Sequence, residues 1–456
     1  MVRAANPRAG ARRRPGSYRA RGRQRLTKSK AFLPFAGLLL IIILVWAATL
    51  HWHRSAPAPA RRTGISDAEL LHISERQRAP DSVVDYRMLD QRLEQLIQKR
   101  DMIGLAVGVV EHGQIRFLKG YGETVAGSGD RVTPNTIFRW GSLSKGVAAD
   151  MVALLASQGK LSLSDPANKY AASLRLPGGA ENRATIADIL SHQLGLAGHS
   201  EDPKLEDGVD PHILRTELGQ LNAICPIGTC WSYQNVAYDS ASEIVERITG
   251  KTYEQAVREH LFGPLGMRSA SMNRAALLAS KSWAKPYVGT KASKPVEVTD
   301  YYYRVPAAGG VNSSIKDLAV WLQAQMGLEP HVLPPAVLQT VQTERVRTVG
   351  ELGRMRKFRE RVRDASYGLG WRIYDYDGHR VIAHRGGVKG YRSLIMFDPA
   401  LKSGVVALWN SSTNQPGGLE FEVMDMIYRL PPQDWLALQS KPVPEGAEPE
   451  TEGGER

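Results

Sequence analysis

Cysteine is nearly absent from this chain of 456 residues, which contains only Cys225 and Cys230. So few thiols exclude a disulfide-rich scaffold, and two cysteines without histidines beside them make a poor zinc site. Their separation is also too wide for a Cys-x-x-Cys redox motif. Two alternatives remain, a small disulfide-closed loop or two free thiols. The loop is expected if this part of the chain is exported.

Acidic residues are absent from residues 1–30, which hold eleven of the 59 Lys and Arg residues. The formal net charge of +13 therefore falls to +2 for the rest of the chain. A basic excess confined to one tail does not define a nucleic-acid-binding domain, although such a tail can contact RNA or anionic lipid. Nucleic acid is therefore not an expected partner of the remaining chain.

Charged residues are absent from residues 31–50, an apolar run long enough to cross the hydrocarbon core of a bilayer as one helix. The Lys and Arg excess before it predicts a cytoplasmic N-terminus and a single-pass anchor in the inner membrane. Everything after Leu50 would then be periplasmic or extracellular. A cleaved signal peptide is the alternative, but the apolar run exceeds an ordinary signal sequence and Ala-Pro-Ala at 56–58 is a poor cleavage site. Without a nearby cysteine, a lipoprotein anchor is excluded.

Composition divides the chain into five segments. The basic tail (1–30) and the transmembrane helix (31–50) precede a linker and juxtadomain segment (51–84). Residues 85–436 have the periodic apolar patterns of a globular domain. The sequence shows no internal repeat. Residues 437–456 are rich in Pro and Glu, have little to bury, and are expected to be a disordered tail.

Strand patterns lie at both ends of the globular domain, with helical patterns between them. Residues 104–111 and 115–121 predict a hairpin, and residues 392–398 and 403–410 repeat the arrangement. This order predicts an α+β fold, in which an antiparallel sheet is flanked by terminal helices and an all-helical subdomain is inserted in the middle. Residues 65–100 have a helical pattern at one end of the domain, with an apolar face at 89–97, and residues 419–430 predict the closing helix at the other. The predicted helices between them are 142–159, 185–190, 236–249, 253–261 and 315–326.

A serine and a lysine three residues apart begin the first of the central helices. Ser142 and Lys145 share one face if a helix starts here, so the amine can take the proton of the hydroxyl. A helix N-terminus also favours the negative charge that develops during acyl transfer. The alternative is an N-cap serine followed by a solvated lysine.

Two further motifs have a similar double interpretation. Tyr233 and Asn235 follow the cysteines, and a tyrosine whose pKa is lowered by a lysine can exchange protons. The alternative is an aromatic core residue with an N-cap asparagine. His384, Gly386 and Gly387 precede a predicted strand, where paired glycines let a substrate approach the backbone closely. The alternative there is a turn with a surface histidine.

Together and in this order, the three motifs resemble those of the serine β-lactamase and penicillin-binding-protein superfamily, and of its class C branch in particular. These motifs are Ser-x-x-Lys, Tyr-x-Asn and a Lys- or His-x-Gly triplet. Further stretches similar to this family are 190–196, 264–267, 308–311 and 367–371. The resemblance covers about residues 89–435 and implies the α+β fold described above. It also implies a serine hydrolase with an acyl-enzyme intermediate, no cofactor and no metal.

The resemblance further implies a role for each motif residue. Ser142 would be the nucleophile and Lys145 the group that takes its proton. Tyr233 would share the base duty and pass the proton to the leaving group, while Asn235 would orient the lysine and the substrate. The backbone N–H groups of Ser142 and Gly387 would form the oxyanion hole.

His384 stands where efficient class C β-lactamases carry lysine. A histidine is mostly neutral near pH 7 and would hold a substrate carboxylate less firmly, which disfavours strong β-lactam hydrolysis. The expected partner is a small-molecule or peptide substrate, including a peptidoglycan-derived one, cut at an amide, ester or β-lactam bond. A non-catalytic protein that keeps the fold to bind cell-wall peptide is the alternative. His192 is expected to be structural.

Residues 345–363 contain eight Lys and Arg residues against two Glu residues. A solvated surface segment is the simpler interpretation. The other interpretation is a contact for an anionic ligand or for the cell envelope, close to the site.

Overall fold

The computed structural model describes residues 65–66 and 72–439, all of which fall in one compact unit. The predicted basic tail, the transmembrane helix at 31–50 and most of the predicted C-terminal tail lie outside the described residues. Within the described ranges, every helix is too short or too polar to cross a bilayer.

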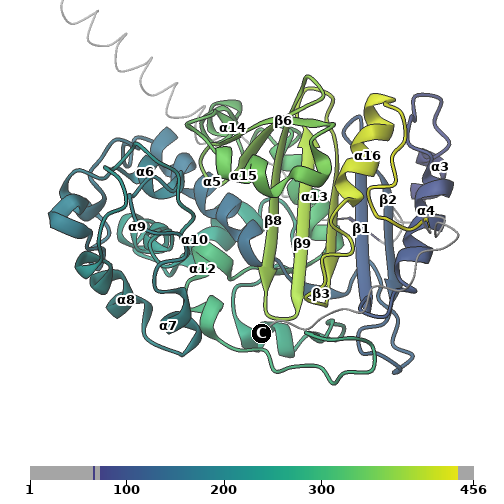
Figure 1. The fold of residues 1–456 in the computed structure, drawn as a ribbon, viewed down its shortest axis with the longest axis horizontal. Coiled ribbons are helices and arrows are strands. Elements are labelled where there is room, and N and C mark those ends of the chain that lie inside the picture. Colours follow the sequence, from purple (N-terminus) through teal and green to yellow (C-terminus); the bar gives the residue numbers. More distant parts are fainter. Residues whose placement is uncertain (1–64, 67–71, 440–456) are drawn as a thin grey trace, which may run out of the picture. The chain divides into compact units, whose positions relative to one another are not determined.

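An eight-stranded antiparallel sheet forms the centre of the unit, with the strand order β2-β1-β10-β9-β8-β7-β6-β5 (Figure 1). Both predicted hairpins are present. β1 (Gly104–Glu111) pairs with β2 (Gln114–Gly122), and β9 (Tyr391–Asp398) pairs with β10 (Ser403–Trp409). Because β10 also pairs with β1, the two ends of the domain meet in one sheet.

Four strands of the sheet had no predicted counterpart. They are β5 (Val346–Arg347), β6 (Val362–Tyr367), β7 (Arg372–Tyr376) and β8 (His379–Val388). β9 pairs with β8 as far as Val388, whereas β7 pairs with β8 only as far as Ala383. On the side of β8 that faces β7, residues 384–388 therefore pair with no strand in the described part of the chain.

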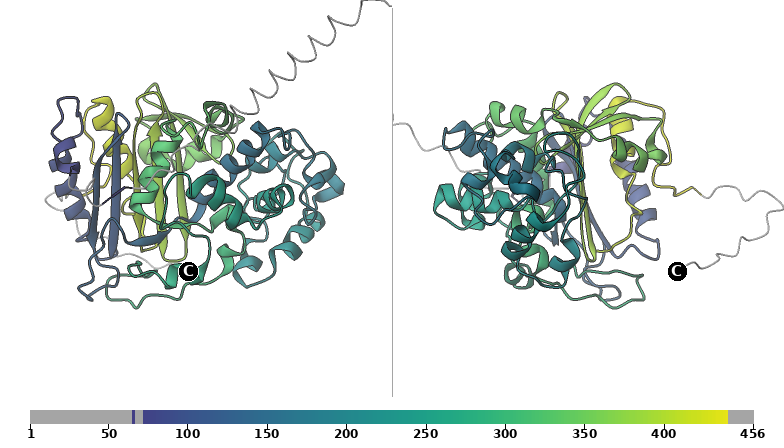
Figure 2. Two further views of the ribbon diagram at one scale, coloured as in Figure 1. Left: turned by 180° about the vertical axis from the view of Figure 1, so that it is seen from behind. Right: turned by 60° about the vertical axis from the view of Figure 1, so that its left-hand side comes forward.

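Helices cover both faces of the sheet (Figures 1 and 2). α4 (Tyr86–Leu96) and α16 (Leu419–Tyr428) pack on one face, together with Val107 and Val109 of β1. α5 (Ser144–Ser157) and α13 (Ile315–Gln325) pack on the other face, with Ala106 of β1. A strand with apolar cover on both sides is buried at every position, and β1 is buried along its whole length.

The predicted helical subdomain lies between two short strands, β3 (Ile137–Arg139) and β4 (Asn312–Ser314), which pair with each other. Its helices are α5 (Ser144–Ser157), α6 (Ile186–Leu190), α7 (Asp202–Glu206), α8 (Pro211–Glu217), α9 (Ser240–Thr249), α10 (Tyr253–Val257), α11 (Arg274–Leu278) and α12 (Pro306–Gly309). The remaining helices are α3 (Ile73–Arg76), α13 (Ile315–Gln325), α14 (Pro335–Gln342) and α15 (Val349–Arg354).

α9 begins four residues later than the sequence pattern predicted. Asp239, directly before it, binds groups outside the helix. Its carboxylate accepts hydrogen bonds from Arg215 at 2.9 Å and from the backbone N–H of Ala307 at 2.9 Å. These contacts hold residues 236–239 in a turn. The apolar residues there are buried in the core although they do not belong to the helix.

The basic segment at 345–363 is spread over β5, α15 and the start of β6. Four of its eight cations pair with carboxylates of the protein. Examples are Arg347 with Asp364 at 2.9 Å and Arg361 with Asp425 at 2.9 Å. The pairing supports the simpler interpretation of the segment as part of the surface framework.

Candidate active site

Ser142 lies in a 3-10 turn, Gly141–Leu143, that continues directly into α5. At this junction the side chain of Ser144, not that of Ser142, forms hydrogen bonds with the neighbouring backbone. Ser144 donates to the Gly141 carbonyl at 2.7 Å and accepts from the backbone N–H of Val311 at 3.0 Å. Ser142 is not the N-cap of either element, so its interpretation as a helix cap is wrong, and the residue is partly exposed.

Glycines allow the turn that carries Ser142 to lie directly against β8. A Cβ on Gly141 would lie 2.7 Å from the backbone nitrogen of Gly387. A Cβ on Gly386 would lie 1.9 Å from the Trp140 carbonyl oxygen and 3.1 Å from the backbone nitrogen of Ser142. The backbones of Ser142 and Gly387 thus converge, as two donors of one oxyanion hole must.

Lys145 is fully buried in the first turn of α5, where its amine has two fixed acceptors. Nζ donates to Asn235 Oδ1 at 2.6 Å and to the Ala308 carbonyl at 3.0 Å. Burial lowers the pKa of Lys145 to about 7, because a buried ammonium loses its hydration, while the carboxylates of Asp202 and Asp239 oppose this shift. A substantial share of the amine is thus neutral near pH 7, as a general base requires.

Tyr233 lies beside this amine, with its ring centroid 4.6 Å from Lys145 Nζ. Burial raises the pKa of Tyr233 above its ordinary value, although a hydrogen bond with Ser142 and the charge of Arg372 act in the opposite direction. The expectation that a lysine lowers the pKa of this tyrosine is therefore wrong, because loss of hydration outweighs the nearby charge. Tyr233 is a protonated phenol in the resting site.

Asn235 connects Lys145 to a carboxylate that no motif indicated. Its Oδ1 accepts from Lys145, and its Nδ2 donates to Asp202 Oδ2 at 2.6 Å. Since α9 begins only at Ser240, the interpretation of Asn235 as a helix cap is wrong. Asp202 lies 33 positions earlier in the sequence, outside every recognised pattern, and only the fold brings it here.

Arg372 is a second residue of the site that no motif indicated. Its guanidinium carbon lies 5.6 Å from the ring centroid of Trp231 and 6.0 Å from that of Tyr233. It also forms an ion pair with Glu351 of α15. In the sequence, only its position directly after the family-like stretch 367–371 indicated a role in the site. Its guanidinium supplies a full positive charge beside Tyr233.

His384 is buried in β8, and both of its ring nitrogens contact other groups of the protein. Nδ1 lies 2.8 Å from the Arg385 carbonyl, which can only accept, so Nδ1 carries the proton. Nε2 then accepts from the hydroxyl of Tyr367 at 3.2 Å. Burial lowers the pKa of His384 well below its ordinary value. The interpretation of this motif as a turn with a surface histidine is wrong.

His192 continues the same chain of hydrogen bonds. The backbone N–H of Gln234 donates to His192 Nδ1 at 3.1 Å, which leaves Nε2 as the donor to Tyr367 at 3.2 Å. Tyr367 thus accepts from His192 and donates to His384. Burial lowers the pKa of His192 as well, so both rings are neutral and each is fixed in one tautomer. The His192 ring also supports Tyr233, with the ring centroids 4.4 Å apart.

Cys225 and Cys230 are joined by a disulfide, which confirms the loop rather than the free thiols. A hydrogen bond holds the start of this loop against residue 195, since the backbone N–H of Ile224 donates to the Gly195 carbonyl at 2.8 Å. Directly after the loop, the N–H of Ser232 donates to the His192 carbonyl at 2.9 Å. These contacts fix the backbone from which Tyr233 projects.

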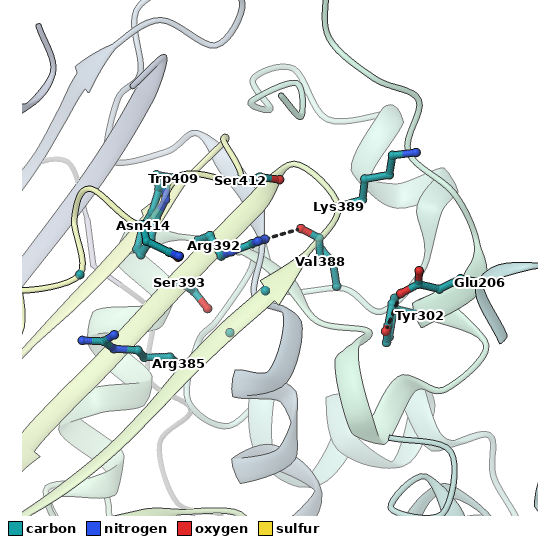
Figure 3. Close-up of a pocket in the computed structure, with 13 residues that line it drawn as sticks. Glu206, Tyr302, Arg385, Val388, Lys389, Arg392, Ser393, Trp409, Ser412 and Asn414 are labelled. Atoms are coloured by element: carbon teal, nitrogen blue, oxygen red, sulfur yellow. Dashed lines mark hydrogen bonds between the residues drawn. The ribbon is translucent and has the colours of Figure 1, made fainter. Parts of the chain in front are cut away.

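A cavity of about 640 Å³ opens beside Gly386 and Gly387 (Figure 3). Lys389 and Arg392 line it, and neither pairs with a carboxylate in the described part of the chain. Arg392 instead donates to the Val388 carbonyl at 3.0 Å, as Figure 3 shows. The cavity shares Gly386 and Gly387 with the site, but Ser142, Lys145, Tyr233 and His384 do not line it, and Glu206 lies in it beside the cations.

The chain belongs to the beta-lactamase family, whose model matches residues 89–425. It is 28% identical over 361 residues to Unguisins hydrolase ungD' of Aspergillus campestris, which covers 75% of this chain and 66% of that relative. Penicillin-binding protein 4 of Amycolatopsis lactamdurans is 28% identical over 343 residues, or 71% of this chain and 84% of the relative. The chain spans slightly less than two thirds of the unguisins hydrolases, 66% of one and 63% of the other.

Among solved structures, the chain is similar to the octameric penicillin-binding protein homologue from Pyrococcus abyssi. The TM-score is 0.68 at 24% sequence identity, and the match covers 77% of this chain and 79% of that one. This likeness concerns the fold. The predicted superfamily and the α+β fold with its antiparallel sheet are thus both confirmed.

Proposed function

We propose that this chain is a membrane-anchored serine hydrolase that acts through an acyl-enzyme on Ser142. One observation carries the proposal. Lys145 is fully buried with a pKa of about 7, and it lies between fixed acceptors beside a serine that is hydrogen-bonded to Tyr233. Burial favours the neutral form of this amine, and a general base next to the serine needs that form.

In acylation, the neutral amine of Lys145 takes the proton of Ser142 as the serine oxygen bonds to the substrate carbonyl carbon. The carbonyl oxygen becomes an oxyanion that accepts from the N–H groups of Ser142 and Gly387. When the bond to the leaving group breaks, Tyr233 donates its phenolic proton to that group. The ammonium of Lys145 then returns a proton to the phenolate, so both groups recover their resting forms.

Deacylation uses the same groups with water as the nucleophile. Tyr233 accepts a proton from the water as it attacks the acyl carbon, while the phenolic proton of Tyr233 passes to the neutral amine of Lys145. The bond to Ser142 breaks, and the proton returns to the serine oxygen. Asn235 holds the amine in place during both steps. His384 supports the site through Tyr367, because both of its ring nitrogens are already hydrogen-bonded.

The substrate we propose is an extended peptide, amide or ester, including a peptidoglycan-derived peptide, with a β-lactam as a poorer substrate. Two observations support this class. The open edge of β8 from His384 to Val388 can pair with an extended chain. Lys389 and Arg392 line the cavity that shares Gly386 and Gly387 with the site, and their charge favours a carboxylate on a substrate that extends past Gly387, a role that the neutral His384 cannot fill. A non-catalytic peptide-binding protein would need the edge and the cations but not the neutral lysine.

The test is covalent labelling of the full chain in detergent with a fluorophosphonate and with a fluorescent penicillin. The expected result is a single adduct on Ser142, located by mass spectrometry and absent from Ser142→Ala. A chain that reacts with neither probe while keeping its far-UV circular dichroism would instead be a binding protein. Nitrocefin, p-nitrophenyl esters and D-Ala-D-Ala peptides then rank the substrates.

We also propose that residues 31–50 anchor the chain in the inner membrane, with the catalytic domain in the periplasm or outside the cell. The support is the apolar run behind a basic tail, together with the disulfide, which persists in oxidising compartments. A periplasm-active reporter fused after Arg62 should be active. An inactive reporter there, with an active one fused before residue 31, would reverse the orientation.

A further inference from the structure

We infer that Asp202 is a positioning residue of this site, because its carboxylate fixes the orientation of the Asn235 amide and thereby directs the lone pair of Lys145 toward Ser142. The inference rests on the proposed acyl-enzyme function. It adds a residue to that function that belongs to none of the three motifs and touches no reacting atom.

The first step concerns the amide. Asn235 Nδ2 lies 2.6 Å from Asp202 Oδ2, and an ionised carboxylate can only accept. The amide must therefore present its NH₂ group to Asp202 and its oxygen to Lys145. Without that acceptor the amide can rotate by half a turn. The NH₂ group would then donate to the neutral amine and occupy the lone pair that has to take the serine proton.

The second step concerns the amine. A neutral lysine has two N–H bonds and one lone pair. Both N–H bonds of Lys145 have an acceptor, namely Asn235 Oδ1 at 2.6 Å and the Ala308 carbonyl at 3.0 Å. The lone pair must then occupy the one remaining direction, and the proposed mechanism requires that this direction face Ser142, three residues earlier in the chain. The amide orientation thus decides whether the amine is ready to act as a base.

The third step concerns Asp202 itself, the first residue of α7. Its side chain is buried, and Oδ1 has no hydrogen-bond partner in the described part of the chain. Oδ2 carries both contacts, since it also lies 2.8 Å from His199 Nδ1. A buried carboxylate oxygen without a donor costs stability, so a purely structural role would favour a different residue here.

The backbone around Asp202 is also strained. His199 has a φ of 60° and Glu201 a φ of 65°, both in the left-handed region that side chains other than glycine rarely adopt. Such conformations persist where the surrounding structure enforces them, and they cluster at functional sites. Here they bring the start of α7 inward, so that the carboxylate reaches the Asn235 amide.

Asp202 also influences Lys145 through its charge. It is the stronger of the two carboxylates that oppose the effect of burial on the pKa of Lys145, ahead of Asp239. Loss of this charge should move the titration of the amine to lower pH. The other titratable groups around Lys145 are Tyr233, Tyr238, His192, His384 and the cation Arg372.

Two variants of the full chain in detergent separate the two effects. Asp202→Asn removes the charge but keeps the shape and one possible acceptor. Asp202→Leu removes both the charge and the acceptor. The matched control is Asp207→Asn, at the exposed end of the same helix. The measurements are the rate of Ser142 labelling by a fluorophosphonate, kcat and KM for a p-nitrophenyl ester, the pH profile of kcat/KM, and the thermal midpoint.

The expected result is a fall in kcat of about 100-fold for Asp202→Leu with little change in KM, as for a base that is poorly oriented. Asp202→Asn should lose less activity, and the acid limb of its pH profile should move to lower pH. Asp207→Asn should match the wild type. If Asp202→Leu does not fold, the isosteric Asp202→Asn decides the question.

The inference is overturned if the folded variants label Ser142 at the wild-type rate with an unchanged pH profile, and the proposed function then still stands. A wild-type chain that does not react at Ser142 would overturn the proposed function, and the role of Asp202 with it. The two failures are therefore distinguished within one experiment.

Discussion

The backbone nitrogen of Gly387 lies 2.7 Å from the point that a Cβ on Gly141 would occupy. Gly141 also has a φ of 55°, so both its conformation and its surroundings require glycine. Through this contact the turn that carries Ser142 is set against β8. The separation of the two proposed oxyanion donors, the N–H groups of Ser142 and Gly387, therefore depends on a residue that takes no part in the proposed chemistry.

Gly141→Ala should therefore push the two donors apart. We expect kcat/KM for a p-nitrophenyl ester to fall by about 100- to 1,000-fold, the usual cost of losing one oxyanion donor. Gly159→Ala is the matched control, because Gly159 has a φ of 71° but no atom within 4 Å of its would-be Cβ. If both variants lose the same activity, backbone strain rather than the contact with Gly387 explains the loss.

The pH dependence of activity should follow Lys145. The amine must be neutral to take the serine proton, and its pKa is about 7. The value of kcat/KM should thus rise as the pH increases through about 7 and then level off. Lys145→Arg, which stays charged, should be inactive at every pH. An activity that does not change between pH 5 and 9 would rule out this lysine as the base.

Stability should also depend on pH through Lys145. Its folded-state pKa of about 7 lies below the ordinary lysine value of 10.5, so between these values the unfolded chain binds more protons. The contribution of this group to stability therefore rises with pH across that window, by at most about 1.4 kcal/mol per pH unit. The stability advantage of Lys145→Met over the wild type should be largest at and below about pH 7 and be lost toward pH 10. Thermal melts should show no such trend for Lys160→Met, at an exposed position just after α5.

Arg392 should act on substrate binding rather than on chemistry. Arg392→Gln is expected to raise KM roughly tenfold for a peptide with a free C-terminal carboxylate, which corresponds to about 1.4 kcal/mol. The same peptide with an amidated C-terminus is the control and should be unaffected. Equal changes for both peptides would mean that the variant disturbs β8 instead of a carboxylate contact.

The disulfide should stabilise the loop before Tyr233. Replacing Cys225 and Cys230 together by serine should lower the free energy of unfolding by about 2 kcal/mol, as expected for closure of so short a loop. Urea unfolding of the wild type with and without a reducing agent gives the control. If reduction does not change the midpoint, other contacts of the loop dominate its stability.

The fold was predictable from sequence wherever the chain pairs with its near neighbours. Both hairpins have alternating runs separated by a few residues, so each pattern contains its own partner. β6, β7 and β8 lacked such a signal, since charged residues and paired glycines interrupt the strand pattern. Consequently His384 was placed before a strand, whereas it lies within β8.

The site was predictable where the motif residues themselves make the contacts. Ser142, Lys145, Tyr233 and Asn235 lie together, as the resemblance implied, but the sign of the tyrosine pKa shift did not follow from sequence. That shift depends on burial, which no motif encodes. Asp202 and Arg372 were missed for a related reason. The packing within the helical subdomain brings Asp202 to Asn235, and the packing of that subdomain against the sheet brings Arg372 to Tyr233.

The hydrogen-bond chain through Tyr367 has a consequence for chemical modification. Reagents that acylate imidazole, such as diethyl pyrocarbonate, need an accessible ring nitrogen. His192 and His384 offer none, because both rings are buried and all four of their nitrogens are hydrogen-bonded. His199 has a side chain that is 57% exposed and in contact with Asp202. Inactivation by such a reagent would therefore indicate modification of His199, which contacts the Asp202 carboxylate that binds Asn235. It would not indicate modification of His384, the histidine of the third sequence motif.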